Sequence, residues 1–224
     1  MRVRRRYLHL NDLPAVIPVF PLTNVLLLPR TRLPLNIFEP RYLAMVDAAM
    51  DTYRLIGMIQ PKETDGEKSA KADLMAVGCV GRIVEYSETE DGHYLITLAG
   101  LARFRVMGER TAKTPYREVA ADYAPFAADM ESDDDLPVAR DRLLAALKPY
   151  LADHAMKTDW KSIEEAPPAS LVNALSMICP FDPKEKQALL EATSVKERGE
   201  ALIALLEIAN AAIPLGRGPK QPLH

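Results

Sequence analysis

A proline-punctuated apolar stretch, residues 17–50, most constrains how this chain can fold. It begins with an apolar run that three prolines interrupt, and a second extended run follows at residues 33–38. Proline fixes φ and lacks a backbone N–H, so such runs suit strand starts, edge strands and turns. A helical pattern then covers residues 41–50. The stretch therefore predicts short, bent strands that lead into one helix, and it contains no residue pattern for a chemical reaction.

Further strand patterns follow along residues 53–123, in several short runs. Gly78 and Gly81 lie inside one run and indicate a bulge or a sharp bend. Asp91-Gly92 separates two runs, and this pair is a strong hairpin signal. Gly100 predicts a break between two later strands. Many short strands with bends and turns favour a small barrel or a bent sheet.

The apolar period changes to that of helices in the C-terminal part. Asp133-Asp134-Asp135 reads as a linker and a solvated helix start, although three consecutive aspartates could also bind a divalent cation. Pro149 lies inside the first helical stripe and predicts a kink or a division there. Residues 182–185 and 194–197 carry helix-start patterns with a capping residue and a glutamate. This part is predicted to be a helical bundle.

The patterns together predict an α+β chain with two domains. A β-domain is expected at residues 14–126 and a helical subdomain at residues 133–213, with flexible tails at residues 1–13 and 214–224. The N-terminus lacks the apolar region of a secretory signal, and no run is long enough to span a bilayer. The expected location is the cytoplasm, without a membrane partner.

Charge and cysteine content favour a binding protein over most other classes. The net charge is −3, with +2 on residues 1–125 and −5 on residues 126–224, so neither part has the basic excess of a nucleic-acid binder. Four arginines near one another in sequence could still supply a basic face for RNA: Arg82, Arg103, Arg105 and Arg110. The two cysteines, Cys79 and Cys179, are expected to be buried reduced thiols, because no short-spaced zinc pattern includes them.

No sequence motif for catalysis, a metal or a cofactor is apparent. The chain lacks the nucleophile elbow G-x-S-x-G and the zinc motif H-E-x-x-H, and residues 66–69 fail the phosphate-loop pattern. Asp47 and Asp51 are four positions apart on the predicted helix and read as a solvated face. We expect a non-enzymatic protein with no cofactor and no resident metal.

Several spaced motifs resemble one known family, the Lon protease N-terminal (substrate-binding) domain. They are IPVFPL and VLLLP at residues 17–29, LPLNIFEPRY at residues 33–42, GCVGRI at residues 78–83 and LAGLARFRV at residues 98–106. The resemblance runs in order from about residue 15 to 212. The chain looks most like stand-alone bacterial proteins that carry this domain, because a Walker motif and a Ser-Lys peptidase module are absent from its sequence.

The resemblance implies a PUA-like β pseudo-barrel followed by helices. It also implies binding of unfolded or extended protein segments in protein quality control, with Lon protease itself as a second expected partner. Phe38, Arg41 and Tyr42, at the junction of strand and helix, are the predicted peptide contacts; core packing or a structural ion pair is the alternative for each. RNA binding through the PUA-like fold is the alternative function, by analogy of fold alone.

Overall fold

The computed structural model describes residues 7–62, 72–111, 113–131, 139–156 and 158–212. The chain is α+β, as predicted, and divides into two compact units. The first comprises residues 1–132 with 181–183, and the second comprises residues 133–180 with 184–224. The β-domain boundary predicted at residue 126 falls inside a 3-10 helix, η2 (Ala124–Met130), which belongs to the first unit.

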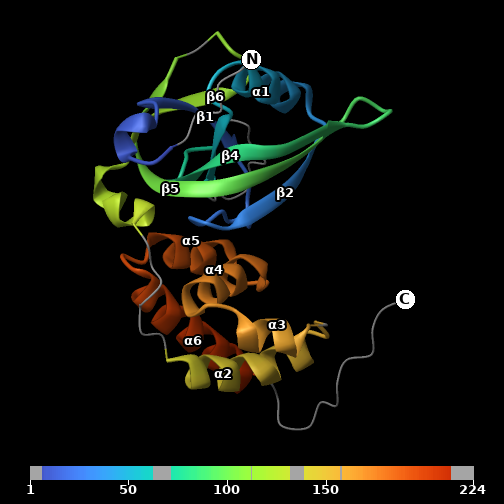
Figure 1. Cartoon of the computed structure of the whole chain (residues 1–224), viewed down its shortest axis with the longest axis vertical. Coiled ribbons are helices and arrows are strands. Elements are labelled where there is room, and N and C mark those ends of the chain that lie inside the picture. Colours follow the sequence, from blue (N-terminus) through green and yellow to red (C-terminus); the bar gives the residue numbers. More distant parts are fainter. Residues whose placement is uncertain (1–6, 63–71, 112, 132–138, 157, 213–224) are drawn as a thin grey trace. The chain divides into compact units, whose positions relative to one another are not determined.

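The first unit is built on one six-stranded sheet with the strand order β2-β5-β4-β3-β1-β6 (Figure 1). The pairings are antiparallel except for β1 with β3, which is parallel. In chain order its elements are η1 (Leu10–Asp12), β1 (Val16–Pro21), β2 (Arg32–Ile37), α1 (Pro40–Asp51), β3 (Leu55–Ile59), β4 (Val77–Glu88), β5 (Tyr94–Arg110), β6 (Arg117–Asp122) and η2.

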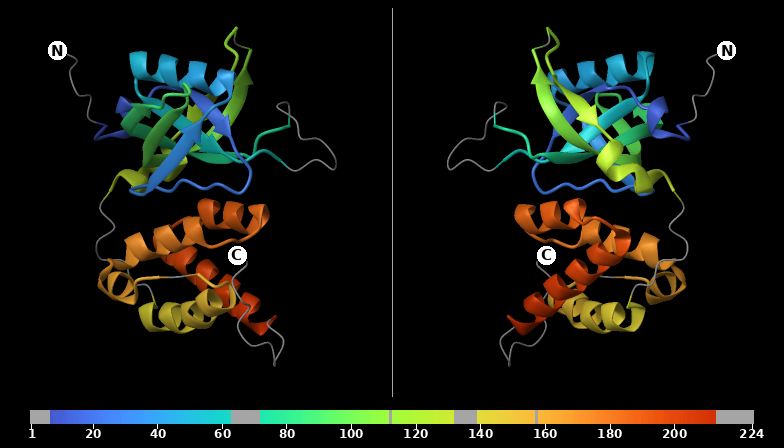
Figure 2. Two further views of the ribbon diagram at one scale, coloured as in Figure 1. Left: turned by 90° about the vertical axis from the view of Figure 1, so that its right-hand side faces the viewer. Right: turned by 90° about the vertical axis from the view of Figure 1, so that its left-hand side faces the viewer.

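The sheet is strongly bent, and Figure 2 shows its strands crossing one another. The C-terminal half of β5 pairs with β6 as well as with β4, so one long strand contributes to two parts of the sheet. β2 pairs only with β5 among the described pairings and forms an open margin. The predicted pseudo-barrel therefore takes the form of a bent sheet and not of a closed barrel.

The predicted break at Gly100 is wrong, because β5 runs through it without interruption. The loop between β1 and β2 packs here: the Leu28 carbonyl oxygen lies where a Cβ on residue 100 would be, and Leu27 packs against Gly81. Arg30 N–H donates to the Gly100 carbonyl and Gly100 N–H donates to the Thr31 carbonyl, each at 2.9 Å. The glycine is needed for the close approach of a buried loop and not for a turn.

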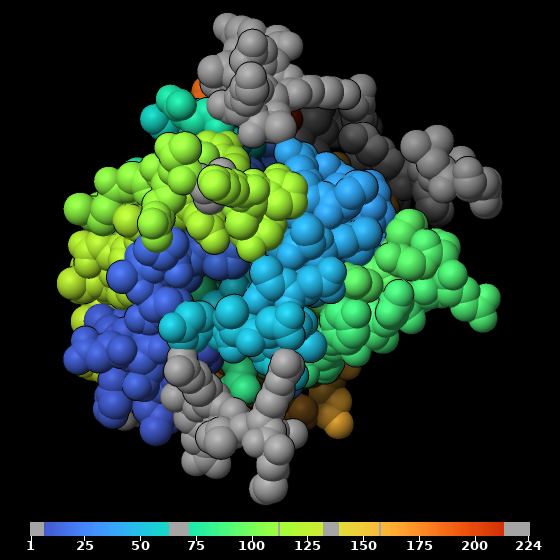
Figure 3. All heavy atoms as spheres, turned by 90° about the horizontal axis from the view of Figure 1, so that it is seen from above, coloured from blue at the N-terminus to red at the C-terminus, as the bar shows by residue number. Residues whose placement is uncertain are grey.

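The β4–β5 hairpin agrees with the sequence patterns. A register shift lies between Val80 and Gly81, where a bulge is predicted, and Gly92 has a φ of 78° at the hairpin turn. The hairpin tip projects beyond α1 and the neighbouring strands (Figures 1 and 3).

One buried hydrophobic cluster of the first unit joins the sheet to the segment before β1. It is formed by Tyr7, Leu13, Ile17, Val19, Leu55, Ile59, Val80, Ala102, Phe104, Val119 and Tyr123. Residues 7–13 thus depart from the predicted flexible tail: Tyr7 and Leu13 are buried, and the Tyr7 hydroxyl donates to the Tyr53 carbonyl at 2.6 Å. The rest of that tail, residues 1–6, lies outside the described residues, as do residues 66–69, 133–135 and 214–224.

The second unit is helical, as predicted. Its helices are α2 (Arg140–Asp153), α3 (Trp160–Glu165), α4 (Pro168–Ile178), α5 (Pro183–Glu191, of which Pro183 belongs to the first unit) and α6 (Val195–Ala211).

Pro149 does not divide α2. Proline perturbs the carbonyls of the preceding turn, and Asn210 Nδ2 of α6 donates to one of them, the Ala146 carbonyl, at 2.8 Å. Ser194 caps α6 by accepting from Glu197 N–H at 3.1 Å, as its motif predicts.

Replacing Gly100 with alanine is expected to destabilise the first unit by at least about 2 kcal/mol, because the added Cβ overlaps the Leu28 carbonyl and the loop must move. Gly108 is the matched control on the same strand, since a Cβ there meets no atom within 4 Å. Urea unfolding of Gly100→Ala, Gly108→Ala and the parent protein measures the difference. Equal midpoints for the two variants would contradict the assigned close approach.

Both cysteines are buried and not disulfide-bonded, as predicted. Burial raises the pKa of Cys179 from 9.0 to about 12, so the folded state keeps the thiol proton while the unfolded state loses it above about pH 9. The free energy of unfolding is therefore expected to fall by up to about 1.4 kcal/mol per pH unit above pH 9 on account of this group.

This pH dependence is measured by urea unfolding from pH 8 to 10, with Cys179→Ala as the comparison. The variant is less stable at pH 8 because of the cavity, but its stability should decline less steeply as the pH rises. Parallel declines would show that Cys179 ionises equally in both states.

Candidate functional site

An open groove lies on the outer face of the first unit's sheet, across β2, β5 and β4. Its volume is about 580 Å³. The lining residues are Pro34, Leu35, Asn36, Glu85, Tyr86, Ser87, Leu95, Ile96 and Thr97. All belong to three neighbouring strands, so the site is a surface of the sheet itself.

Strand alternation explains which side chains face this groove. Successive side chains of a strand point to opposite faces, and directly paired residues share a face. Asn36 of β2 is opposite Leu95 of β5, which is in turn opposite Ser87 of β4. Along β2 the exposed residues alternate with half-buried Leu33 and Leu35, so the outer face carries the former and the inner face the latter.

Two exposed apolar side chains give this face its hydrophobic character. Leu95 is 46% exposed in the groove, and Phe38, the residue that follows β2, is 59% exposed. The Phe38 and His93 rings lie 5.9 Å apart at the same end of the sheet. We call this surface the β2 face; it comprises Phe38, Arg32 and the outward-facing groove residues Pro34, Asn36, Glu85, Ser87, Leu95 and Thr97.

The charges on the β2 face neutralise each other. Arg32 Nη1 lies 2.9 Å from Glu85 Oε1, and the Thr97 hydroxyl donates to Glu85 Oε2 at 2.7 Å. Both charged side chains are well exposed. The surface therefore combines two exposed apolar side chains with polar groups and a neutralised ion pair, which suits a polypeptide better than a highly charged ligand.

The structure separates the three predicted contact residues. Phe38 is on the β2 face, whereas Tyr42 is only 6% exposed and its ring centroid lies 4.1 Å from that of Phe20. Burial raises the pKa of Tyr42, an effect that the neighbouring Arg41 guanidinium opposes. Arg41 Nη2 forms an ion pair with Glu39 Oε2 at 2.8 Å. Tyr42 is thus packed in the interior and Arg41 is held in an ion pair, which are the structural roles given as the alternative. Peptide contact by Phe38, Arg41 and Tyr42 stays a prediction.

Sequence reasoning missed the other residues of the β2 face, Leu95 above all. The alternation at residues 93–98 indicates which residues share a face, but it does not say which face becomes the outer one. The alternation of Pro34 and Asn36 with leucines is typical of an edge strand. This pattern becomes informative only once the pairing of β2 is known.

The opposite side of the hairpin is attached to α1. A hydrogen bond between Tyr94 and Asp47 raises the pKa of Tyr94, with burial as the second cause. The Tyr94 ring lies 5.1 Å from that of Tyr86 in an edge-on arrangement. Asp47, predicted to belong to a solvated face, therefore holds the hairpin against the helix, and this contact positions the strands that form the groove.

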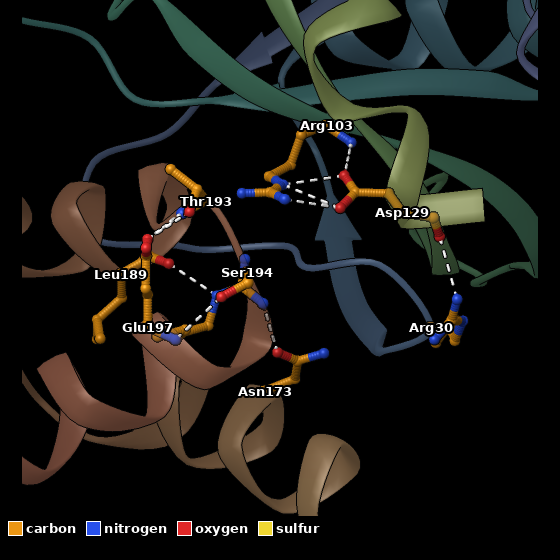
Figure 4. Close-up of polar contacts among 9 residues, drawn as sticks. Arg30, Arg103, Asp129, Asn173, Leu189, Thr193, Ser194 and Glu197 are labelled. Carbon is orange, nitrogen blue, oxygen red and sulfur yellow. Dashed lines mark hydrogen bonds and ion pairs between the residues drawn. The ribbon is translucent and has the colours of Figure 1, made fainter. Parts of the chain in front are cut away.

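Arg103 is not available for a basic RNA-binding face. Its guanidinium is buried and paired with Asp129 of η2, with Nη2 to Oδ1 at 2.7 Å and Nε to Oδ2 at 2.9 Å (Figure 4). The Arg103 backbone N–H also donates to Asp129 Oδ2, at 2.8 Å, and Arg30 Nη2 donates to the Asp129 carbonyl. The pair fastens η2 to β5, so one of the four arginines proposed for RNA has a structural role.

The described residues contain no group of three or more histidine, cysteine or acidic side chains placed to hold a metal ion. Over the same part of the chain, none of the helices has the length and apolarity needed to cross a membrane. His93 lies at the hairpin turn beside Asp91, with Nδ1 to Oδ2 at 3.2 Å.

Comparison with known proteins points to one family. The family model described as the ATP-dependent protease La (LON) substrate-binding domain matches residues 16–207. The chain is 27% identical to a Lon protease of Anaeromyxobacter dehalogenans over 88% of its length, and 28% identical to the Lon protease of Escherichia coli K12 over 85%. It spans only 23% and 24% of these two relatives, about a quarter of their length.

Two solved structures share the fold. A Lon N-terminal domain protein from Xanthomonas campestris matches with a TM-score of 0.60 and 24% identity, covering 84% of this chain and 97% of that one. The N-terminal domain of a Mycobacterium avium complex Lon protease matches with a TM-score of 0.59 and 16% identity, covering 86% and 98%. The fold is thus that of a mixed α+β domain of this kind. More particularly, the chain belongs to the Lon substrate-binding domain family, as its sequence motifs indicated.

Replacing Asp129 with alanine is expected to cost about 3–5 kcal/mol of stability, because it leaves the Arg103 guanidinium buried without its counter-charge. Arg32→Ala, which breaks the exposed Arg32–Glu85 pair, should cost less than about 1 kcal/mol. Chemical unfolding of both variants provides the measurement. A similar small loss for each would mean that the Arg103–Asp129 pair does not stabilise the folded unit.

Proposed function

We propose that this chain is a non-catalytic protein-binding module that captures extended apolar segments of unfolded proteins through the β2 face. The observation that carries the proposal is the pair of exposed apolar side chains on this face, Phe38 and Leu95, on a domain of the Lon substrate-binding family. The matched family model describes a substrate-binding domain, not the protease or ATPase parts of the relatives.

The shape of the surface supports a polypeptide ligand. The groove is an open surface of about 580 Å³ across three strands, with a polar rim that contains Thr97, Ser87 and Asn36. Small-molecule sites are usually concave and enclose most of the ligand. An extended chain instead needs a long, accessible surface with apolar contacts for some of its side chains, which the β2 face provides.

RNA binding, the alternative, loses part of its proposed basic face. Arg103 is paired with Asp129 inside the unit, and the guanidinium of Arg82 lies 5.8 Å from the Tyr7 ring, where residues 7–13 pack. The β2 face has one arginine, and Glu85 neutralises it. Nucleic-acid binding requires an excess of positive charge along the ligand's path.

A role in protein quality control and a cytoplasmic location accompany the proposal, since capture of unfolded segments serves that purpose. Contact with a full-length Lon protease is a separate proposal that rests on the family membership. Co-purification of the tagged chain with Lon protease from native cells tests it, with the Asp129→Ala variant as a folding-dependent control.

Phe38→Ala and Leu95→Ala are each expected to weaken binding of an unfolded protein by about fivefold, because each removes an exposed apolar contact from the β2 face. The probe is fluorescently labelled lysozyme that has been reduced and carboxymethylated, and the readout is fluorescence anisotropy. Both positions are solvent-accessible, so the variants should retain the parent's thermal stability.

Met107→Ala is the matched control. Met107 is 66% exposed on β5 but is not among the residues that line the groove. Its removal should leave the affinity unchanged. The proposal fails if the parent does not bind the unfolded probe at high micromolar concentration, or if all three variants weaken binding equally.

A further inference from the structure

We propose that the β2 margin receives the captured segment as an additional β-strand, and that Pro34 restricts which segments fit. This inference rests on the proposed function and adds the binding mode and the chemistry of the ligand. In this mode main-chain hydrogen bonds supply much of the affinity and alternate side chains supply selectivity.

Among the described residues, the hydrogen-bond pattern of β2 leaves one side of the strand without a partner strand. Gly100 N–H donates to the Thr31 carbonyl, so Thr31 directs its carbonyl toward β5. Successive residues of an antiparallel strand alternate in direction, which turns the backbone groups of Leu33, Leu35 and Ile37 toward β5 as well. The groups of Arg32, Pro34 and Asn36 then point away from the sheet.

This open margin presents an asymmetric set of main-chain groups. Arg32 and Asn36 each offer an N–H and a carbonyl, whereas Pro34 offers only a carbonyl. Extended main chain has the repeat needed to match this row of groups. A ligand residue opposite Pro34 can donate its N–H but finds no donor for its own carbonyl, which must stay in contact with water.

The missing donor also argues for a foreign segment over a second copy of β2. An antiparallel pair of two β2 strands centred on Pro34 would lack both of its central N–H···O bonds. Proline on edge strands is a known protection against such self-pairing. A foreign segment loses only one donor at this position.

The side chains of β2 define the class of segment. Ligand residues opposite Leu33 and Leu35 would cover these half-buried leucines, so apolar residues are favoured there. Ligand residues opposite Pro34 and Asn36 would face the groove that contains Leu95. The preferred ligand is therefore a strand-like segment with apolar residues at alternate positions and no proline, the kind that folded proteins bury in their own sheets.

Backbone methylation of a ligand peptide tests the main-chain contacts without changing the protein. The probe is labelled acetyl-Thr-Val-Thr-Val-Thr-Val-amide, together with analogues that carry one N-methyl group at each position in turn. If the peptide adds to β2 as a strand, methylation should weaken binding about threefold or more at every second residue and little at the others. An equal effect at all positions would overturn strand addition.

Asn36→Pro tests the same contacts from the protein side. It removes an outward N–H while leaving the hydrogen bonds to β5, and Leu35 already has the extended backbone that a following proline requires. Affinity for the peptide is expected to fall about threefold or more relative to Asn36→Ala, which keeps the N–H. Pro34→Ala supplies the missing donor and should raise affinity by a similar factor.

The outcomes separate the two proposals. Binding of unfolded lysozyme that is equal for Asn36→Pro and Asn36→Ala, with no two-residue periodicity in the methylated peptides, overturns strand addition and leaves protein capture intact. Failure of the parent to bind either probe overturns both. Thermal melts of each variant confirm folding, and if Asn36→Pro does not fold, the methylation series and Pro34→Ala decide the question.

Discussion

The packing of a buried loop against two glycines determines how the strands of the first unit are arranged. Leu27 and Leu28 approach Gly81 on β4 and Gly100 on β5 more closely than any larger residue permits. The hydrogen bonds from Arg30 and to Thr31 then fix where the chain enters β2. Because β2 begins here, the loop decides that this strand pairs with β5 and remains at the margin of the sheet. The candidate site depends on that placement.

Much of the fold could be predicted from residue patterns. The Asp91-Gly92 hairpin, the bulge at Gly81 and the cap at Ser194 follow from local chemistry, and all three are present. Gly100 was misassigned because a glycine in a strand signals either a turn or a close approach, and only the position of Leu28 distinguishes them. The sequence pattern places Tyr7 and Leu13 in a tail, because nothing local shows that a distant core will bury them.

The candidate site was less predictable for a related reason. Phe38 is predicted from its position at the strand–helix junction, and the structure exposes its side chain. Arg41 and Tyr42 share that junction, yet one is paired with Glu39 and the other packs on Phe20. Whether a strand lies at the edge of a sheet is a property of the topology, so the importance of Leu95 and Pro34 appeared only with the pairing of β2.

The order of the strands along the chain has a consequence for synthesis. β2 lies within the first 40 residues, but its partner is β5, and β1 has β6 as one of its two neighbours. A ribosome must therefore translate beyond Asp122 before the sheet can be completed. Until β5 has been made, β2 has no partner strand in the nascent chain, and β1 lacks one of its two neighbours until β6 follows. During synthesis, the unpaired strands of this domain therefore resemble the exposed strands that we propose it captures. Chaperones that bind nascent chains would encounter the domain at that stage.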